Sequence, residues 1–245
     1  MPKFFAPWLS QDEGIVTFSG KNAEHLRVLR VREGEELTVC DGNGLDFRCV
    51  VEMASKDTFR LRILKTETSA GEPRVSVTVY AALPKGDKTE LIVQKAVELG
   101  AAEIVFFLSS RCVARPDGKA AAGKTERLCK VAEAAAMQSM RGRIPSVRWQ
   151  PDYGRMLEEA AGTDLGAFLW ENARNQSLRS LLQAHTGFRS AALITGPEGG
   201  FSQEEASQAE AAGIRPVTLG PRILRCETAP LCALSALMYE TGDLE

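Results

Sequence analysis

The chain has 245 residues, of which 44% are hydrophobic and 25% are charged, and its formal net charge is −2 at pH 7. This length and apolar content predict a folded protein of one or two domains and exclude a disordered chain. The charge excludes a protein that coats nucleic acid by charge alone, because such binding depends on many Lys and Arg residues that neutralise phosphates.

The sequence predicts a cytoplasmic protein whose cysteines are reduced. Its apolar runs are far shorter than the roughly 20 residues that a membrane helix needs, and the start of the chain, MPKFFAPWLS, lacks the basic and apolar segments of an export signal. The six cysteines form no C-x-x-C pair, and only His25 and His185 could join them as metal ligands. We therefore expect no metal site, no disulfide and no membrane contact.

The first 72 residues are predicted to form a small β-domain. Short apolar and alternating runs indicate strands in GIVTFSG, EELTVC, LDFRCVVEMAS and TFRLRILKTE, interrupted by one helix at 22–31. The segment 41–44 (DGNG) is a hairpin turn sequence. A short linker at 69–73 (SAGEP) ends this domain.

From residue 73 onward, strands alternate with helices. This order predicts an α/β domain over 73–245 with a mostly parallel sheet covered by helices. Strands are expected at 75–83, 104–108, 166–170, 191–195 and 216–219, and helices at 88–99, 125–140 and 203–212.

Basic residues are concentrated in one part of this second domain. Residues 109–148 carry nine basic and three acidic side chains, a local balance of +6. Such a concentration is typical of a localised RNA-binding surface. Charge alone fits a solvated helix face equally well.

A glycine-rich segment follows the strand expected at 191–195. In 193–202 (LITGPEGGFS), three glycines allow positive φ angles and close approach of a ligand, while Pro197 stiffens the loop. Ser202 and Glu205 form a capping box that begins the next helix beside this loop. Parallel α/β sheets bind ligands at such loops, although an isolated loop of this kind could also be an ordinary tight turn.

The standard nucleotide-binding loops do not match this segment. A phosphate loop needs G-x-x-x-x-G-K-S/T, and a dinucleotide loop needs G-x-G-x-x-G after the first strand of its unit. The sequence therefore argues against ATP hydrolysis and against NAD chemistry.

A second loop of the same kind lies at 219–230 (LGPRILRCETAP). It combines a Gly-Pro turn, a short extended piece and a helix start, with Thr228 as the predicted cap and Pro230 in the first turn. Two such loops after neighbouring strands would close around one small ligand.

The two loops, in this order and near the C-terminus, resemble those of the SPOUT methyltransferases, whose chain forms a trefoil knot. Within that superfamily the chain is most similar to the RsmE family of 16S ribosomal RNA uridine N3-methyltransferases. The similarity covers nearly the whole chain. It is carried by 25–30 (HLRVLR), 95–100 (KAVELG), 138–141 (QSMR) with Pro145, 196–200 (GPEGG) and 219–229 (LGPRILRCETA).

The resemblance implies a PUA-like RNA-binding β-barrel domain over 1–72 and a knotted methyltransferase domain over 73–245. The enzyme would bind S-adenosyl-L-methionine, form a homodimer and methylate N3 of a uridine in 16S ribosomal RNA of the small subunit. Two other functions stay open, namely a SPOUT methyltransferase that acts on another RNA and an RNA-binding module that has lost catalysis. Some positions depart from the family pattern: Leu128, Ala134, Met137 and Cys226.

By this resemblance, both glycine loops contribute to the cofactor pocket. Ile223 and Leu224 would form apolar walls, while backbone groups read the adenine edge. Glu198 would bind a ribose hydroxyl or only cap its loop, and Glu171 would line the pocket or be an ordinary surface acid. The expected cofactor residues are Thr195, Gly196, Glu198, Gly199, Gly200, Leu219, Gly220, Ile223, Leu224, Arg225 and Glu171.

Methylation at uridine N3 requires loss of the imide proton, so the site must hold a base or stabilise the anion. Arg225 is expected to stabilise negative charge or hold a phosphate, and Arg141 to do the same from the partner subunit. The alternative for the arginines near His25 is a solvated helix face with Val28 and Leu29 pointing inward. The expected RNA-binding residues are His25, Arg27, Arg30, Arg32, Arg111, Arg115, Gln138 and Arg141.

Overall fold

The computed structural model of the chain describes residues 3–9, 14–174 and 176–244, and these form two compact units. The first unit runs to Glu72 and also takes in Ala136–Ile144, while the second contains Pro73–Ala135 and Pro145–Glu245. A division of the sequence after residue 72 does not anticipate that a later segment returns to the first unit.

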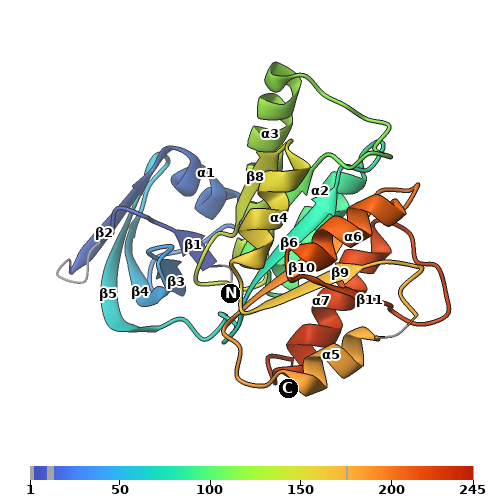
Figure 1. The fold of residues 1–245 in the computed structure, drawn as a ribbon. Helices are drawn as coiled ribbons and strands as arrows, with labels where there is room; N and C mark the ends of the chain where they lie inside the picture. The colour runs from blue at the N-terminus through green and yellow to red at the C-terminus, as the bar shows by residue number, and fades with distance from the viewer. Residues whose placement is uncertain (1–2, 10–13, 175, 245) are drawn as a thin grey trace. The chain divides into compact units, whose positions relative to one another are not determined.

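In the described part of the first unit, the elements are β1 (Lys3–Phe5), β2 (Ile15–Ser19), α1 (Gly20–Val28), β3 (Glu36–Cys40), β4 (Leu45–Ala54) and β5 (Thr58–Thr68). The strands form a curled sheet in the order β1-β3-β4-β5-β2 (Figure 1). Only the β1–β3 pair in this sheet is parallel. This mostly antiparallel sheet confirms the predicted β-domain.

The core of the first unit follows from alternation along its strands. In β5, Phe59 and Leu61 are buried, whereas Arg60 and Arg62 are exposed. The buried side chains of one face pack together with Phe4, Phe18 and Phe47 in a single apolar cluster. Burial of this face is the main stabilising contribution that the sheet makes.

Helix α1 is shorter than the predicted helix at 22–31, and its buried face is made by Ala23 and Leu26. Val28 and Leu29 are 71% and 44% exposed. The inward orientation of these two residues, which the solvated-face interpretation assumed, is therefore wrong. The helix stops here because Arg30 takes a positive φ of 58°.

The turn at 41–44 joins β3 to β4 as predicted. The Asp41 carboxylate accepts hydrogen bonds from the backbone amides of Asn43 (2.8 Å) and Leu45 (3.0 Å). Gly42 and Gly44 have φ angles of 75° and 105°, which glycine adopts without a steric penalty.

In the described part of the second unit, the elements are β6 (Ser76–Ala82), α2 (Lys88–Glu98), β7 (Glu103–Phe107), α3 (Gly118–Gln138), β8 (Ser146–Gln150), α4 (Tyr153–Ala161), β9 (Leu165–Leu169), α5 (Leu178–Ala184), β10 (Ser190–Thr195), α6 (Gln203–Ala211), β11 (Arg215–Val217) and α7 (Thr228–Glu240). The last residues of α3 belong to the first unit.

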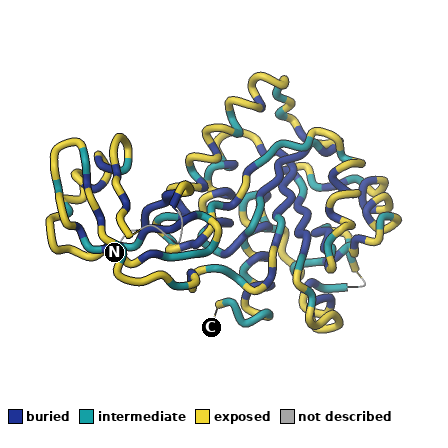
Figure 2. Tube along the Cα trace, turned by 90° about the vertical axis from the view of Figure 1, so that its left-hand side faces the viewer, coloured by how far each residue is buried: buried dark blue, intermediate teal, exposed yellow. Residues whose placement is uncertain are grey.

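The second unit is built on a six-stranded sheet in the order β11-β9-β10-β6-β7-β8, and every neighbouring pair in it is parallel. Helix α7 packs against β6 and β10, and α4 packs against β8, β9 and β10. Most residues of the central strands are buried (Figure 2), whereas the edge strands β8 and β11 are only partly buried. The predicted α/β architecture is confirmed, although β8, α4 and α5 were not predicted, and α3 begins at Gly118 instead of 125.

No helix within the described ranges is both long enough and apolar enough to cross a membrane.

A buried ion pair ties the returning segment to the end of the first unit. The Arg141 guanidinium is only 3% exposed, and its Nε and Nη2 atoms each donate to the Glu72 carboxylate over 2.9 Å. The same carboxylate accepts the backbone amides of Gly142 (2.8 Å) and Arg143 (3.1 Å). Burial alone would raise the pKa of Glu72, but these hydrogen bonds and the Arg141 charge lower it below 4.5.

We predict that Glu72→Gln lowers the free energy of unfolding by about 2–4 kcal/mol at neutral pH, because it leaves a buried arginine without its counter-charge. Since the pKa of Glu72 is lower in the folded than in the unfolded state, its contribution is present above pH 4.5 and is lost as pH falls through the folded value. Urea unfolding of both proteins at several pH values should show their difference narrowing in acid.

The matched control is Glu67→Gln, because Glu67 pairs with Lys65 at the surface and its side chain is 40% exposed. That variant should change stability by less than about 1 kcal/mol. Equal losses of unfolding free energy in the two variants would contradict the stabilising role of the Glu72–Arg141 pair.

Candidate functional site

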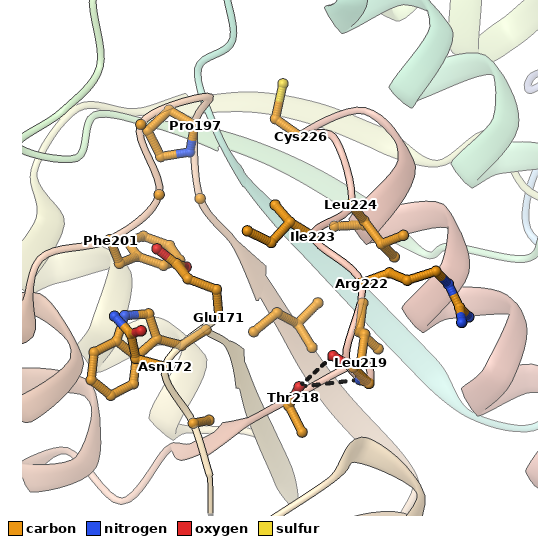
Figure 3. Close-up of a pocket in the computed structure, with 18 of the residues that line it drawn as sticks. Glu171, Asn172, Pro197, Phe201, Thr218, Leu219, Arg222, Ile223, Leu224 and Cys226 are labelled. Atoms are coloured by element: carbon orange, nitrogen blue, oxygen red, sulfur yellow. Dashed lines mark hydrogen bonds between the residues drawn. The ribbon is translucent and has the colours of Figure 1, made fainter.

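The strands β11, β9 and β10 end in one line, because Leu169 is paired in register with both Thr195 and Val217. The loops that follow therefore start side by side, and they enclose a cavity of about 990 Å³ (Figure 3). This is the usual position of a ligand site in a parallel α/β sheet. The cavity is lined by residues 169–174, 196–201 and 218–224, with Cys226 and Ala229.

The β10 loop (residues 196–201) folds back over a buried aromatic ring. Phe201 is 2% exposed, and its ring centroid lies 4.1 Å from that of Phe168. A Cβ atom at Gly196 would lie only 3.2 Å from the Phe201 ring, and Gly200 has a φ of 64°. A side chain at position 196 would press against the ring, and the turn at position 200 favours glycine.

The predicted capping box begins α6 directly after this loop. The Ser202 hydroxyl accepts the Glu205 amide over 3.1 Å, and the Glu205 carboxylate accepts the Ser202 amide over 2.8 Å. The other oxygen of the same carboxylate accepts the Ser110 amide over 2.7 Å. The end of the β10 loop is thereby fixed to the segment after β7 as well as to its own helix.

The β11 loop (residues 218–226) turns at Gly220, whose φ is 103°. The Thr218 hydroxyl accepts the Gly220 amide and donates to the Gly220 carbonyl, each over 3.1 Å (Figure 3). Beyond the turn, Ile223 is 88% exposed although it is apolar and lines the cavity. An apolar side chain displayed in this way fits a ligand with an apolar face.

Helix α7 starts after the β11 loop at Thr228, and its N-cap residue is Glu227 without a side-chain cap hydrogen bond. The predicted cap at Thr228 is therefore wrong by one residue, while Pro230 lies in the first turn as expected.

The β9 loop (residues 170–174) lies between the other two in the sheet order and forms the middle of the cavity. Glu171 is exposed, and a Cβ atom at Gly200 would collide with its carboxylate, so the β9 and β10 loops are in close contact. Trp170 lines the same cavity, and its indole Nε1 is buried without a hydrogen-bond partner among the described residues. Apart from Glu171, sequence reasoning missed this loop, although it directly follows a predicted strand.

Glu198 is held by contacts with other parts of the chain. Its carboxylate accepts the Lys85 amide over 3.1 Å and the Lys88 Nζ over 3.0 Å. Burial alone would raise the pKa of Glu198, but its own backbone amide, Lys88 and the Lys85 amide lower it. These bonds favour the interpretation in which Glu198 fixes its loop over one in which it binds a ribose hydroxyl.

The structure brings most of the expected cofactor residues together. The cavity is lined by Gly196, Glu198, Gly199, Gly200, Leu219, Gly220, Ile223, Leu224 and Glu171.

Two expected cofactor residues do not line the cavity. Thr195 is buried at the end of β10, where its hydroxyl donates to the Tyr80 carbonyl over 3.3 Å. Arg225 has an exposed side chain, while its carbonyl accepts the amides of Thr228 and Ala229. Sequence reasoning also missed Trp170, Asn172, Pro197, Phe201, Thr218 and Arg222, which line the cavity.

The expected RNA-binding residues of the first unit lie on and after α1. His25, Arg27, Arg30 and Arg32 are all exposed. The His25 ring lies edge-on to Phe4, with centroids 5.2 Å apart, so this side chain is partly anchored by the core.

Arg111 and Arg115 lie close to the β10 loop or the strand end beside it. Arg111 donates to the Gly199 carbonyl over 2.9 Å, and Arg115 donates to the carbonyls of Ser109 and Ser110 over 3.1 Å. Both side chains are exposed, so their charges remain open to solvent.

Fewer of the basic side chains at 109–148 are available to bind RNA phosphates than the sequence suggests. Arg127, Arg141 and Arg148 pair with acids outside that segment, and Lys130 pairs with Glu126 inside it. Gln138 is exposed, whereas Arg141 is buried against Glu72. The expectation that Arg141 acts on RNA or in catalysis is therefore corrected: its guanidinium is committed to the structure of the first unit.

Comparisons with known proteins match both units. A family model described as an RNA methyltransferase domain matches residues 71–238, and one described as an RNA methyltransferase PUA domain matches 18–64. Ribosomal RNA small subunit methyltransferase E of Bacillus subtilis is 34% identical over 98% of this chain and 97% of its own length.

Two similar solved structures contain S-adenosylmethionine. Ribosomal RNA small subunit methyltransferase E of Neisseria gonorrhoeae, bound to S-adenosyl methionine, is 32% identical with a TM-score of 0.84, over 97% of each chain. A Legionella pneumophila structure in complex with the bound cofactor SAM is 31% identical with a TM-score of 0.84, over 97% of this chain and 96% of that one.

We predict that Gly200→Ala lowers the free energy of unfolding by about 1–2 kcal/mol, the cost of a left-handed conformation for an L-residue. The added methyl group would also displace the Glu171 carboxylate. Urea unfolding measures this loss. Gly123→Ala in α3, where nothing lies within 4 Å of the new Cβ, is the control and should stabilise by up to about 1 kcal/mol; a loss of the same size in both variants would contradict the assignment.

Proposed function

Because the chain belongs to the ribosomal RNA small subunit methyltransferase E family, we propose that it transfers a methyl group from S-adenosylmethionine to N3 of a uridine in 16S ribosomal RNA. The observation that carries the proposal is the cavity of three loops at the ends of β9, β10 and β11. Its support is the similarity of nearly the whole chain to a structure described as bound to S-adenosyl methionine.

The residues of the cavity fit S-adenosylmethionine. Ile223 and Leu224 offer apolar surface for the adenine ring, while Gly196 and Gly220 bring backbone amides and carbonyls close to the ligand without a Cβ between them. The cavity of about 990 Å³ is large enough for a nucleoside with an amino-acid tail. When bound, S-adenosylmethionine supplies an electrophilic methyl group.

The nucleobase side of the reaction requires charge stabilisation. Uridine N3 must lose its imide proton to attack the methyl group, and the negative charge of the resulting anion is shared with the uracil oxygens until the methyl group is transferred. Arg225 follows Leu224, which lines the cavity, and its side chain is exposed. We assign to it the stabilisation of that charge, or of a neighbouring phosphate.

Each unit has exposed residues that could contact RNA. Exposed arginines at 27, 30 and 32, with His25, present donors for phosphates on the first unit, and Arg111 and Arg115 do so beside the β10 loop. Gln138 is exposed in the segment that returns to the first unit. A target base must leave its stack to reach the methyl group, so contacts of this kind would hold the nucleotide in its splayed form.

We also propose a cytoplasmic location, a knotted path of the C-terminal segment, a homodimer and a division near residue 72 between the RNA-binding and methyltransferase parts. The resemblance to the family implies these four features.

Transfer from labelled S-adenosylmethionine to unmodified small ribosomal subunits, and separately to free 16S ribosomal RNA, tests the function. We expect label in a nucleoside whose mass and chromatographic position are those of N3-methyluridine. Cofactor binding without label on either RNA would redirect the search to other RNAs. Absence of cofactor binding would contradict the methyltransferase assignment.

Replacement of Arg225 by methionine should lower kcat/KM for the RNA substrate about 10- to 100-fold, because one charge-stabilising group is removed. The Kd for S-adenosylmethionine should stay within about twofold, since the side chain does not line the cavity. Arg179→Met on α5, also an exposed arginine, is the control and should leave both constants unchanged. A loss of cofactor affinity instead of RNA turnover would sink this role.

A further inference from the structure

Lys88 begins helix α2, and its ammonium group lies between two acids from different loops. Its Nζ is 3.0 Å from the Glu198 carboxylate and 3.2 Å from the Glu227 carboxylate. It also lies 3.5 Å from the Cys226 sulfur. One cation from a third element therefore contacts groups that stand on both sides of the cavity.

The two acids belong to the loops that the proposed cofactor site depends on. Glu198 lies within the β10 loop, and Glu227 directly follows the β11 loop as the N-cap residue of α7. Figure 3 shows Pro197 and Cys226, the neighbours of these acids, at the same end of the view and on different loops. The sequence-based expectation that these loops follow neighbouring strands is wrong, because β9 lies between β10 and β11 in the sheet.

The charges of these three side chains show that Lys88 draws the two loops together. Without Lys88, two carboxylates would face each other across the gap, and like charges at short range repel. With Lys88, each carboxylate is attracted to a common point. The side chains of Lys88 and Glu198 are 31% and 33% exposed and that of Glu227 only 15%, so the attraction is partly protected from screening by water.

The ionisation of the group agrees with this geometry. Hydrogen bonding to Glu198 and Glu227 raises the pKa of Lys88 above its ordinary value. Burial would raise the pKa of Glu227, but hydrogen bonds from its own backbone amide, Cys226 and Lys88 lower it. Burial raises the pKa of the Cys226 thiol to about 11, so at neutral pH it is an uncharged neighbour of the ion pairs.

We propose that Lys88 is a positioning residue that holds the β10 and β11 loops at the separation at which S-adenosylmethionine binds, an inference that rests on the proposed function. Lys88 does not line the cavity, so it acts through Glu198 and Glu227. Its removal should therefore affect cofactor affinity through the loops.

The test compares Lys88→Met, Lys88→Arg and Lys95→Met in the full chain. Lys95 lies on the same helix and pairs with Glu98 three residues away, so it joins no separate elements and is a matched control. We expect Lys88→Met to raise the Kd for S-adenosylmethionine, measured by calorimetry, about tenfold. Lys88→Arg should restore it to within about threefold, and Lys95→Met should leave it unchanged.

Two further readouts separate positioning from a general loss of stability. The KM for S-adenosylmethionine should rise in Lys88→Met, while kcat at saturating cofactor stays within about twofold. Amide hydrogen exchange of the cofactor-free protein should become faster in residues 196–201 and 220–226 together, with no change across β6 and β7.

The outcomes distinguish the two levels of the proposal. Wild-type protein that binds no S-adenosylmethionine would overturn the proposed function together with this inference. Wild-type protein that binds normally, with Lys88→Met binding equally well or Lys95→Met equally impaired, would overturn the role of Lys88 alone.

Discussion

The candidate site depends on the register of β9 with its two neighbouring strands, β10 and β11. Leu169 is level with Thr195 on one side and with Val217 on the other, so three loops leave the sheet at the same height. A parallel sheet enforces this convergence, because all its carboxyl ends meet at one edge. The cavity is a consequence of strand pairing first and of loop sequence second.

The weakest part of that arrangement is β11, which has only three residues, Arg215–Val217. Its pairing continues beyond the strand: Thr218 donates to the Gln176 carbonyl and accepts the Leu178 amide, each over 3.0 Å. Val217 also accepts the Trp170 amide over 3.0 Å. These backbone hydrogen bonds join the segments that follow β9 and β11. They explain how an edge strand of three residues supports one side of the cavity.

Some charged residues of this protein form ion pairs that stabilise the fold, and others remain exposed. Several basic side chains between residues 109 and 148 are neutralised by partners elsewhere, so the local balance of the sequence overstates the positive surface. Many arginines remain exposed, such as Arg225 and Arg27, but they are spread along the chain and alternate with acidic residues. A chain with a net charge of −2 can therefore act on nucleic acid only if shape and a small number of placed donors select the site.

The sequence anticipated those features that depend on local chemistry. Alternating residues in β5, the DGNG turn, the Ser202–Glu205 capping box and the two glycine loops all have short-range causes, and the structure contains each of them. Three of the elements missed were short: β1, β8 and α5 have three, five and seven residues, too few for a clear period. Helix α4 was missed although its nine residues bury Met156, Leu157 and Ala160 on one face.

What the sequence could not supply was pairing between distant positions. Nothing in the motif QSMR distinguishes an arginine that meets RNA from one that is buried, and only the fold places Arg141 against Glu72. The β9 loop was overlooked for a related reason, because its membership of the cavity follows from the strand order and not from its own residues.

The composition of the first unit from two stretches of chain bears on how such a protein can be divided or recombined. Glu72 closes one stretch and Arg141 belongs to the other, so a single cut between them separates the partners of a buried pair. If the N-terminal part were exchanged between relatives, the buried pair would form only if the remaining chain had a compatible residue at the position of Arg141, more than sixty residues after Glu72. Inheritance of the two parts as one block is the simpler evolutionary route, and it makes the boundary at residue 72 a poor place for a natural gene fusion.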